Sequence, residues 1–176
     1  MKTITTFTDP KLQDAVVQEL NTALLANATL APYIEHIFGI VHTGYDEENN
    51  SYPSVYYNDG SRKNMMLFPD NKVKSFGFWE FDGADVLDDD DGFNYSLTFL
   101  FWGNLERLND GKNYDFTSEI EQMVIKILSD NGATDVSYTQ DDVFGGYSKY
   151  QENKKQTLMR PNTGFKIGMD IHSFIC

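Results

Sequence analysis

The chain is poor in several residue types, and each shortage excludes a class of protein to which it could belong. It contains one cysteine, Cys176, which excludes an internal disulfide framework and fits a reducing compartment. No stretch approaches the ~18 consecutive apolar residues of a membrane-spanning helix. The segment from Met1 to Pro10 also lacks the apolar run that marks a secretory signal. We therefore expect a soluble protein with no membrane segment.

Cationic residues are also scarce. The 176 residues include 14 Lys and Arg against 27 Asp and Glu, a formal net charge of −13. Such a chain lacks the attraction to phosphate that dominates nucleic-acid binding, so sequence-specific nucleic-acid binding is not expected. Aromatic residues are abundant instead, with 13 Phe, 10 Tyr and 2 Trp. This apolar content predicts a folded chain, and its length fits one domain spanning residues 1–176.

Two segments have the apolar spacing of amphipathic helices. The first is predicted over residues 10–28, with Asp9 as N-cap and Pro10 at the first helical position. The second is predicted over residues 118–131, where Ser118 and Glu121 match the capping-box pattern. Both helices would bury one apolar face against the rest of the domain.

Shorter apolar or alternating segments predict strands. Residues 93–102 alternate most cleanly, and their second half is apolar on both faces, which is typical of a central, covered strand. The other predicted strands cover residues 36–42, 54–57, 63–68, 76–81, 135–138 and 165–172. We therefore predict an α+β fold in a single domain, with a mixed, mostly antiparallel sheet packed by the two helices.

Two polar segments are predicted as surface insertions, an acidic loop over 82–92 and a polar loop over 139–157. The acidic loop holds six aspartates but fails as an EF-hand. Placing Gly92 at position six would put Leu87 and Thr98 where the two end ligands belong. A looser Ca²⁺ or Mg²⁺ site is an alternative, whereas a block of like charges usually forms a solvated loop.

No other motif predicts a cofactor, a metal or a catalytic set. His36 and His42 would lie ~20 Å apart along one strand, too far to share a zinc ion. The chain has no nucleophile elbow and no phosphate-binding glycine loop. Glu80 and Asp82 flank an aromatic residue, so a hydrolase that uses these acids is kept as an alternative.

The aromatic residues support two interpretations. Eight Phe and Trp residues lie between positions 76 and 102, which is more apolar surface than two strands can bury by themselves. Some of these side chains, with Trp79 and Trp102 foremost, would face a partner, because large aromatic residues concentrate at interface centres. Alternatively, the two helices cover one face of the sheet and these residues form an ordinary core.

The order of the segments resembles a known family. An amphipathic helix is followed by a strand, by the Tyr-Pro-x-Val-Tyr-Tyr segment at 52–57 and by the long strand at 93–102. A helix starting at Thr117-Ser118 then precedes Met159-Arg160-Pro161 and a terminal strand at 165–175. This layout resembles the tail terminator and tail completion proteins of tailed bacteriophages and prophages, in which a first helix precedes a mixed sheet and a second helix packs on that sheet.

The resemblance implies a non-enzymatic structural protein without a cofactor. Such a protein is a subunit of a homohexameric ring in the virion, assembled in the host cytoplasm, which joins the tail tube to the neck. Each subunit presents a different patch to each neighbour. The expected interface residues are Asp88, Asp89, Asp90 and Asp91, either lining the bore, where they would repel DNA as it passes, or meeting a basic neighbour. A stand-alone module that binds a small molecule or a protein through Trp79 and Trp102 is the rival hypothesis.

Overall fold

The computed structural model describes residues 3–4, 10–57, 63–67, 69, 73–87, 92–108, 111–112, 114–151 and 161–174. Its helices are α1 (Gln13–Ala26), α2 (Thr117–Asp130) and the short α3 (Ser148–Gln151), with a 3-10 turn at Ala31–Tyr33. Its strands are β1 (Thr3–Ile4), β2 (His36–Ile40), β3 (His42–Tyr45), β4 (Ser51–Tyr57), β5 (Lys63–Met66), β6 (Ser75–Val86), β7 (Gly92–Asn104), β8 (Ala133–Thr139) and β9 (Asn162–Phe174). No described helix is long and apolar enough to cross a membrane.

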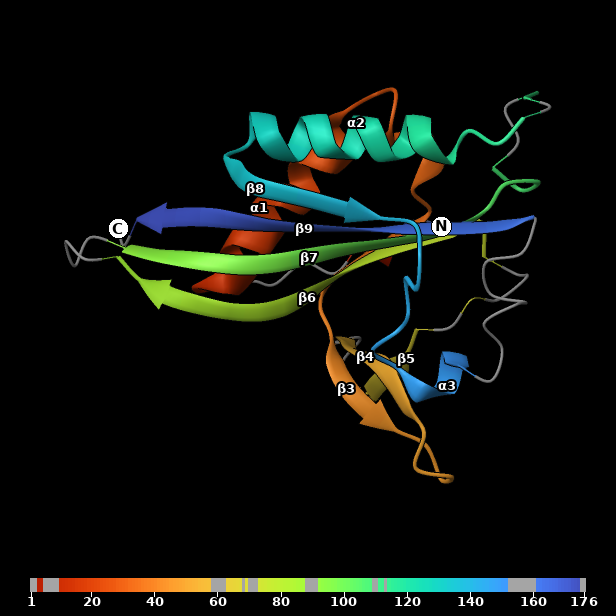
Figure 1. Ribbon diagram of the computed structural model, residues 1–176, viewed down its shortest axis with the longest axis horizontal. Helices are drawn as coiled ribbons and strands as arrows, with labels where there is room; N and C mark the ends of the chain where they lie inside the picture. The colour runs from red at the N-terminus through yellow and green to blue at the C-terminus, as the bar shows by residue number, and fades with distance from the viewer. Residues whose placement is uncertain are drawn as a thin grey trace.

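Most strands join one large sheet. Its six strands lie in the order β1-β2-β6-β7-β9-β8 (Figure 1). The two pairings that involve β2 are parallel, and the other three are antiparallel. The predicted α+β domain with a mixed, mostly antiparallel sheet and two main helices is therefore confirmed. A second, antiparallel sheet of β3, β4 and β5 stands beside the large one.

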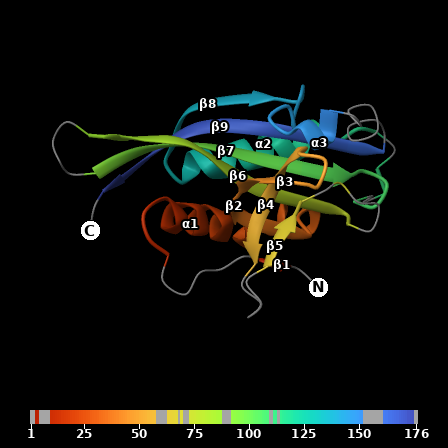
Figure 2. The same cartoon turned by 90° about the horizontal axis from the view of Figure 1, so that it is seen from below.

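The strand at the centre of the large sheet, β7, carries buried side chains on both faces. Successive residues of a strand point to opposite faces, so Phe99 and Phe101 face one core whereas Leu100 and Trp102 face another. The first core is covered by α1 and α2, which pack on the same face of the sheet (Figures 1 and 2). The second is covered by the small sheet and by the segment 143–150.

A buried asparagine ties α1 to the sheet in the first core. The indole Nε1 of Trp79 donates a 2.8 Å hydrogen bond to Oδ1 of Asn21, and Nδ2 of Asn21 donates to the carbonyl oxygen of Phe38 at 3.1 Å. Asn21 is 2% exposed, and the Trp79 ring lies 4.9 Å from that of Phe99. Because all the polar atoms in this bridge find partners inside the core, the position of the helix relative to β2 and β6 is fixed.

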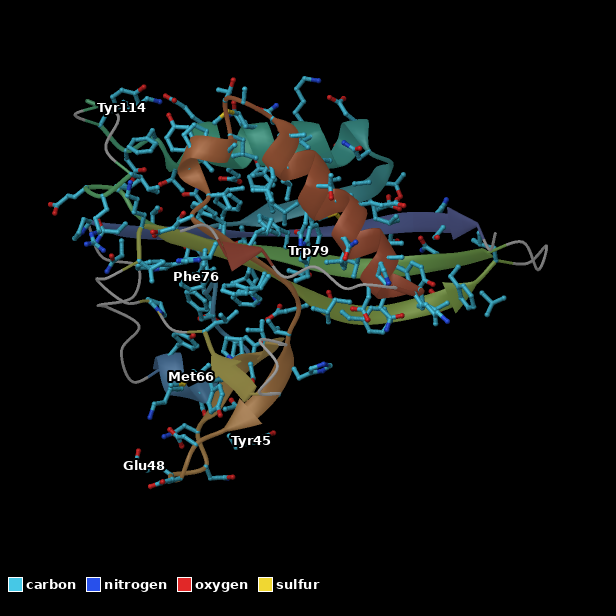
Figure 3. The ribbon with its side chains drawn as sticks, turned by 180° about the vertical axis from the view of Figure 1, so that it is seen from behind. Tyr45, Glu48, Met66, Phe76, Trp79 and Tyr114 are labelled. Carbon is cyan, nitrogen blue, oxygen red and sulfur yellow. The ribbon has the colours of Figure 1, made fainter. Side chains whose placement is uncertain are left out.

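Stacked rings fill the second core. Phe76 lies 5.3 Å from Trp102, and Phe144 stacks on Tyr150 at 4.4 Å between ring centroids. The Tyr150 hydroxyl donates to the carbonyl of Leu67, which follows β5. Figure 3 labels one residue from each core, Trp79 and Phe76. The segment after β8 thus joins the small sheet to the large one.

This packing corrects the prediction of a polar surface loop at 139–157. Its described part, 139–151, places Val143, Phe144, Tyr147 and Tyr150 in the interior, and α3 lies within it. These side chains are needed because β6 and β7 have large apolar residues on both faces. The residues from 152 to 157 of that prediction lie outside the described part of the chain.

The predicted helix starts also need correction. Helix α1 spans 13–26, within the predicted 10–28, because Leu12 has a left-handed φ of 55° and separates Pro10 from the helix. Asp9 lies outside the described residues. Helix α2 spans 117–130, close to the predicted 118–131, but it has no capping box. Instead, Oδ1 of Asp115 accepts the Thr117 N–H at 3.0 Å.

The acidic loop predicted at 82–92 is largely strand. Residues 82–86 complete β6, and Gly92 opens β7. The backbone N–H of Leu87 donates to the Gly92 carbonyl at 3.1 Å and closes the hairpin. The four residues between these two, Asp88 to Asp91, lie outside the described part of the chain.

Replacing the buried asparagine tests the bridge to α1. Asn21→Ala leaves the Trp79 indole and the Phe38 carbonyl without partners, so we expect the free energy of unfolding to fall by about 2–4 kcal/mol. Thr22→Ala, which removes only an exposed bond to the Gln18 carbonyl, should cost less than about 0.5 kcal/mol. Urea unfolding followed by circular dichroism measures both, and equal losses would contradict the bridge.

Replacing an aromatic side chain tests the second core. Phe144 is 4% exposed, so Phe144→Ala should lower the free energy of unfolding by about 3–5 kcal/mol. The matched variant Phe81→Ala removes a side chain that is 40% exposed and should cost clearly less. Thermal and urea unfolding give the two losses. A Phe144→Ala variant as stable as the parent chain would restore the surface-loop interpretation.

Candidate functional site

The best candidate for a functional surface is the outer half of the β6–β7 hairpin together with β9. The small sheet and α3 lie beneath only the part of the large sheet where β6 begins (Figure 1). Further along, the face of the sheet opposite the helices carries polar side chains, which we call the polar face: Glu80, Asp82 and Asp85 from β6, Asn94, Ser96 and Thr98 from β7, and Lys166, Asp170 and His172 from β9.

A β-bulge places Asp82 on this face. The pairing of β6 with β7 shifts between Phe81 and Gly83, so Asp82 has no residue opposite it. Its Oδ2 accepts a 2.7 Å hydrogen bond from the Thr98 hydroxyl. Beyond the bulge the alternation is reversed, which brings Ala84 and Val86 to the helix side with Phe81. The outer part of β6 is therefore apolar on one face and acidic on the other.

Neighbouring strands supply donors to the acids of the polar face. Asp170 accepts from the Ser96 hydroxyl at 2.7 Å and from the Asn94 amide at 3.2 Å. Glu80 pairs with Lys166, with 3.2 Å between Oε2 and Nζ. These cross-strand bonds hold the carboxylates in fixed positions while leaving the face with four acids against one lysine. Its charge is therefore negative.

Tyr147 forms the inner border of the polar face. Its side chain is 6% exposed and its hydroxyl is hydrogen-bonded to Glu80. Burial raises the pKa of Tyr147 well above its ordinary value, and the negative charge of Glu80 raises it further. The phenol therefore keeps its proton, and its O–H donates a hydrogen bond to the Glu80 carboxylate. Tyr147 thus links the second core to the acidic side chains of the polar face.

The segment that carries Tyr147 is anchored to the small sheet. Ser51 and Ser148 bond reciprocally, each hydroxyl oxygen accepting the other's backbone N–H at 2.8 Å. Lys149 forms an ion pair and hydrogen bond with Asp46. This bond from Lys149, with a smaller contribution from the Asn50 backbone N–H, lowers the pKa of Asp46 to about 2. The position of Tyr147 thus depends on contacts between α3 and the small sheet.

The predicted interface residues fall into two groups, one outside the described part of the chain and one buried in the cores. Asp88, Asp89, Asp90 and Asp91 lie outside the described residues and stand between β6 and β7 in the sequence. Trp79 is 0% exposed and Trp102 is 1% exposed, because they face the first and second cores. The prediction that these two tryptophans form an interface or a binding surface is therefore corrected, and the alternative of an ordinary core describes them.

The acids kept as a hydrolase pair do lie together. Glu80 and Asp82 both belong to the polar face, one bonded to Lys166 and Tyr147 and the other to Thr98. Within the described part of the chain, no group of three or more His, Cys, Asp or Glu residues is arranged to hold a metal ion.

Sequence reasoning missed Tyr147, Lys166 and Asp170. Polar residues alternate with apolar ones along both 94–98 and 166–172, so the sequence predicts a polar face for each strand. Whether the two polar faces lie side by side depends on the register of the strands, and no local sequence pattern gives that register. No family model matches the chain, and neither does any curated protein or solved structure.

The low pKa of Asp46 gives a test of the anchor. Because the pKa falls from 3.8 in the unfolded chain to about 2, this ion pair contributes stability above pH 4 that is lost as the pH falls toward 2. In Lys149→Met the Asp46 pKa should rise toward 3.8 but stay below it, because Asn50 still donates. Carbon-13 NMR titration of the Asp46 carboxyl measures the change.

Lys126→Met is the matched control, because it removes an exposed ion pair with Asp130 on α2 and should leave the Asp46 titration unchanged. An Asp46 pKa that stays near 2 without Lys149 would show that α3 is not held in this way.

Proposed function

We propose that the chain is a non-enzymatic structural subunit of a homohexameric ring in the tail or neck of a phage or prophage virion, in the manner of a tail terminator. The layout of the elements supports the proposal. Helix α1 precedes every strand of a mixed sheet except the two-residue β1, and α2 packs on the same face of that sheet, which is close to the arrangement that the resemblance implies. The ring would join the tail tube to the neck proteins.

The observation that carries the proposal is the reach of the β6–β7 hairpin, because the four aspartates at positions 88–91 stand between its two strands in the sequence. The described ends of these strands lie side by side, since the Leu87 N–H donates to the Gly92 carbonyl. In Figure 1 this end lies at the extremity of the sheet, far from the small sheet. Cyclic symmetry would gather such ends from all subunits at one radius.

Acid gathered at the bore of a ring suits the passage of DNA. Repulsion between carboxylates and phosphates keeps the DNA from adhering to the wall, and the net charge of −13 acts in the same direction. The four aspartates could instead meet a basic neighbour in the ring. The two roles, lining the bore and contacting a neighbouring subunit, predict different results when the four aspartates lose their charge.

Mass measurement tests the ring. We expect the purified chain to sediment with six times the chain mass of 20.1 kDa over a tenfold range of concentration, and to form closed rings in negative-stain electron micrographs. Gel filtration of those rings with a short DNA duplex at low salt should leave the DNA unbound. A monomer at every concentration, with no rings on the grids, would contradict the proposal.

The variant with Asn at positions 88 to 91 separates the two roles of the acids. A changed ring mass would assign them to a contact between subunits, and an intact ring that retains DNA would assign them to the bore. If ring mass and DNA retention both match the parent chain, neither role holds. Replacing Glu47 and Glu48, exposed acids next to β3, by Gln is the matched control.

A further inference from the structure

Among the described residues, the outer part of β6 forms a sheet edge without a strand partner. Strand β2 pairs with β6 only as far as Trp79, and the last bond runs from the Val41 N–H to the Trp79 carbonyl at 2.8 Å. From Glu80 to Val86, β6 pairs with β7 on one side, and no described residue pairs with its other side. We call this stretch the outer edge. Its unpaired backbone groups can form a ladder with another extended chain.

The outer edge has two chemically different faces. On the helix side, Phe81 is 40% exposed and Val86 is 64% exposed, and the Phe81 ring lies 6.4 Å from that of the buried Tyr95. On the opposite side are Asp82 and Asp85, both exposed. A strand added here would continue the apolar layer with one set of alternate side chains and meet carboxylates with the other.

The opposite edge of the sheet, β8, differs in charge. Both edges carry one irregularity: the β6–β7 register shifts at the Asp82 bulge, and the β8–β9 register shifts between Thr134 and Ser137. The outer edge presents two exposed acids, Asp82 and Asp85, whereas Asp135 is the one acid of β8. Of these two edges, the outer edge of β6 is therefore the better template for a cationic strand.

We infer that the outer edge binds an extended segment of a partner protein as an added β-strand, and that this segment alternates apolar residues with Lys or Arg. Charge selects the occupant. A second copy that offered its own outer edge would place acids beside Asp82 and Asp85, which is destabilising, whereas lysines there would pair with them. The binding surface does not depend on the chain being a ring subunit.

A synthetic peptide tests the surface. The probe is fluorescein-labelled Lys-Val-Lys-Val-Lys-Val-Lys with blocked ends, added to the full-length chain. Its anisotropy should rise on binding, and hydrogen exchange followed by mass spectrometry should slow in peptides that cover 80–86 but not in those that cover 133–139. Both readouts work on a monomer or on a ring, so failure here is distinguishable from failure of the ring proposal.

Two altered peptides separate the contribution of charge pairing from that of the backbone hydrogen bonds. Glutamate in place of each lysine should abolish binding through repulsion, and full backbone N-methylation should abolish it by removing the donors. Equal binding of either altered peptide would overturn the inference. So would protection of β8 instead of β6, or no binding of the lysine peptide at millimolar concentration.

Variants of the chain complete the test. Asp85→Asn removes one exposed charge from the outer edge and should weaken peptide binding about two- to fivefold. Asp135→Asn is the matched control on β8, where asparagine also tolerates the left-handed backbone, and it should leave binding unchanged. Val86→Lys, which places a cation on the exposed apolar side, should weaken binding further. Equal affinities in all variants would overturn the inference.

Discussion

Double-sided burial of the inner half of β7 is the constraint on which the rest of the fold depends. From Phe99 to Trp102 every side chain is buried, and alternate residues face opposite sides of the sheet. One cover cannot keep both faces from water, so the chain needs two. Burying a large side chain contributes roughly 1.5–3 kcal/mol, so a bare second face would forfeit that contribution at Phe76, Phe78 and Trp102. The small sheet and the segment 143–150 supply the second cover.

The sequence predicts the strands better than it predicts what covers them. The period-two pattern of 93–102 indicates a central strand because both faces are apolar within that segment itself. The second cover is harder to recognise, since Val143, Phe144, Tyr147 and Tyr150 are spread through polar residues and Gly145-Gly146. Their spacing of one, three and three residues is nearly helical, but only the apolar face opposite gives that spacing a meaning. Trp79 and Trp102 were wrongly predicted to be exposed for the same reason, because the local sequence does not show which segments cover them.

The acidic segment shows why the ends of strands were predicted less well. Asp82 and Gly83 break the aromatic alternation of β6, which favours a loop from residue 82 onward. The bulge between Phe81 and Gly83 absorbs this break and lets the strand continue to Val86. A bulge depends on the register of the partner strand, so the polar face could not be assembled from β6 alone. Glu80 and Asp82 were recognised as neighbours, but Lys166 and Tyr147 were not.

The division of the hairpin into two halves indicates where the chain can meet other molecules. Its inner half uses both faces for the cores, and β2 occupies the edge of β6 as far as Trp79. Within the described part of the chain, its outer half has a polar face held by cross-strand bonds and an edge without a strand partner. Four aspartates stand between its two strands in the sequence. The bonds from Thr98 to Asp82 and from Ser96 to Asp170 keep this half in order without a second cover. Because these bonds fix the positions of acidic side chains, the outer half combines rigidity with an excess of acids. A cationic strand at the edge therefore gains backbone bonds and charge pairing together.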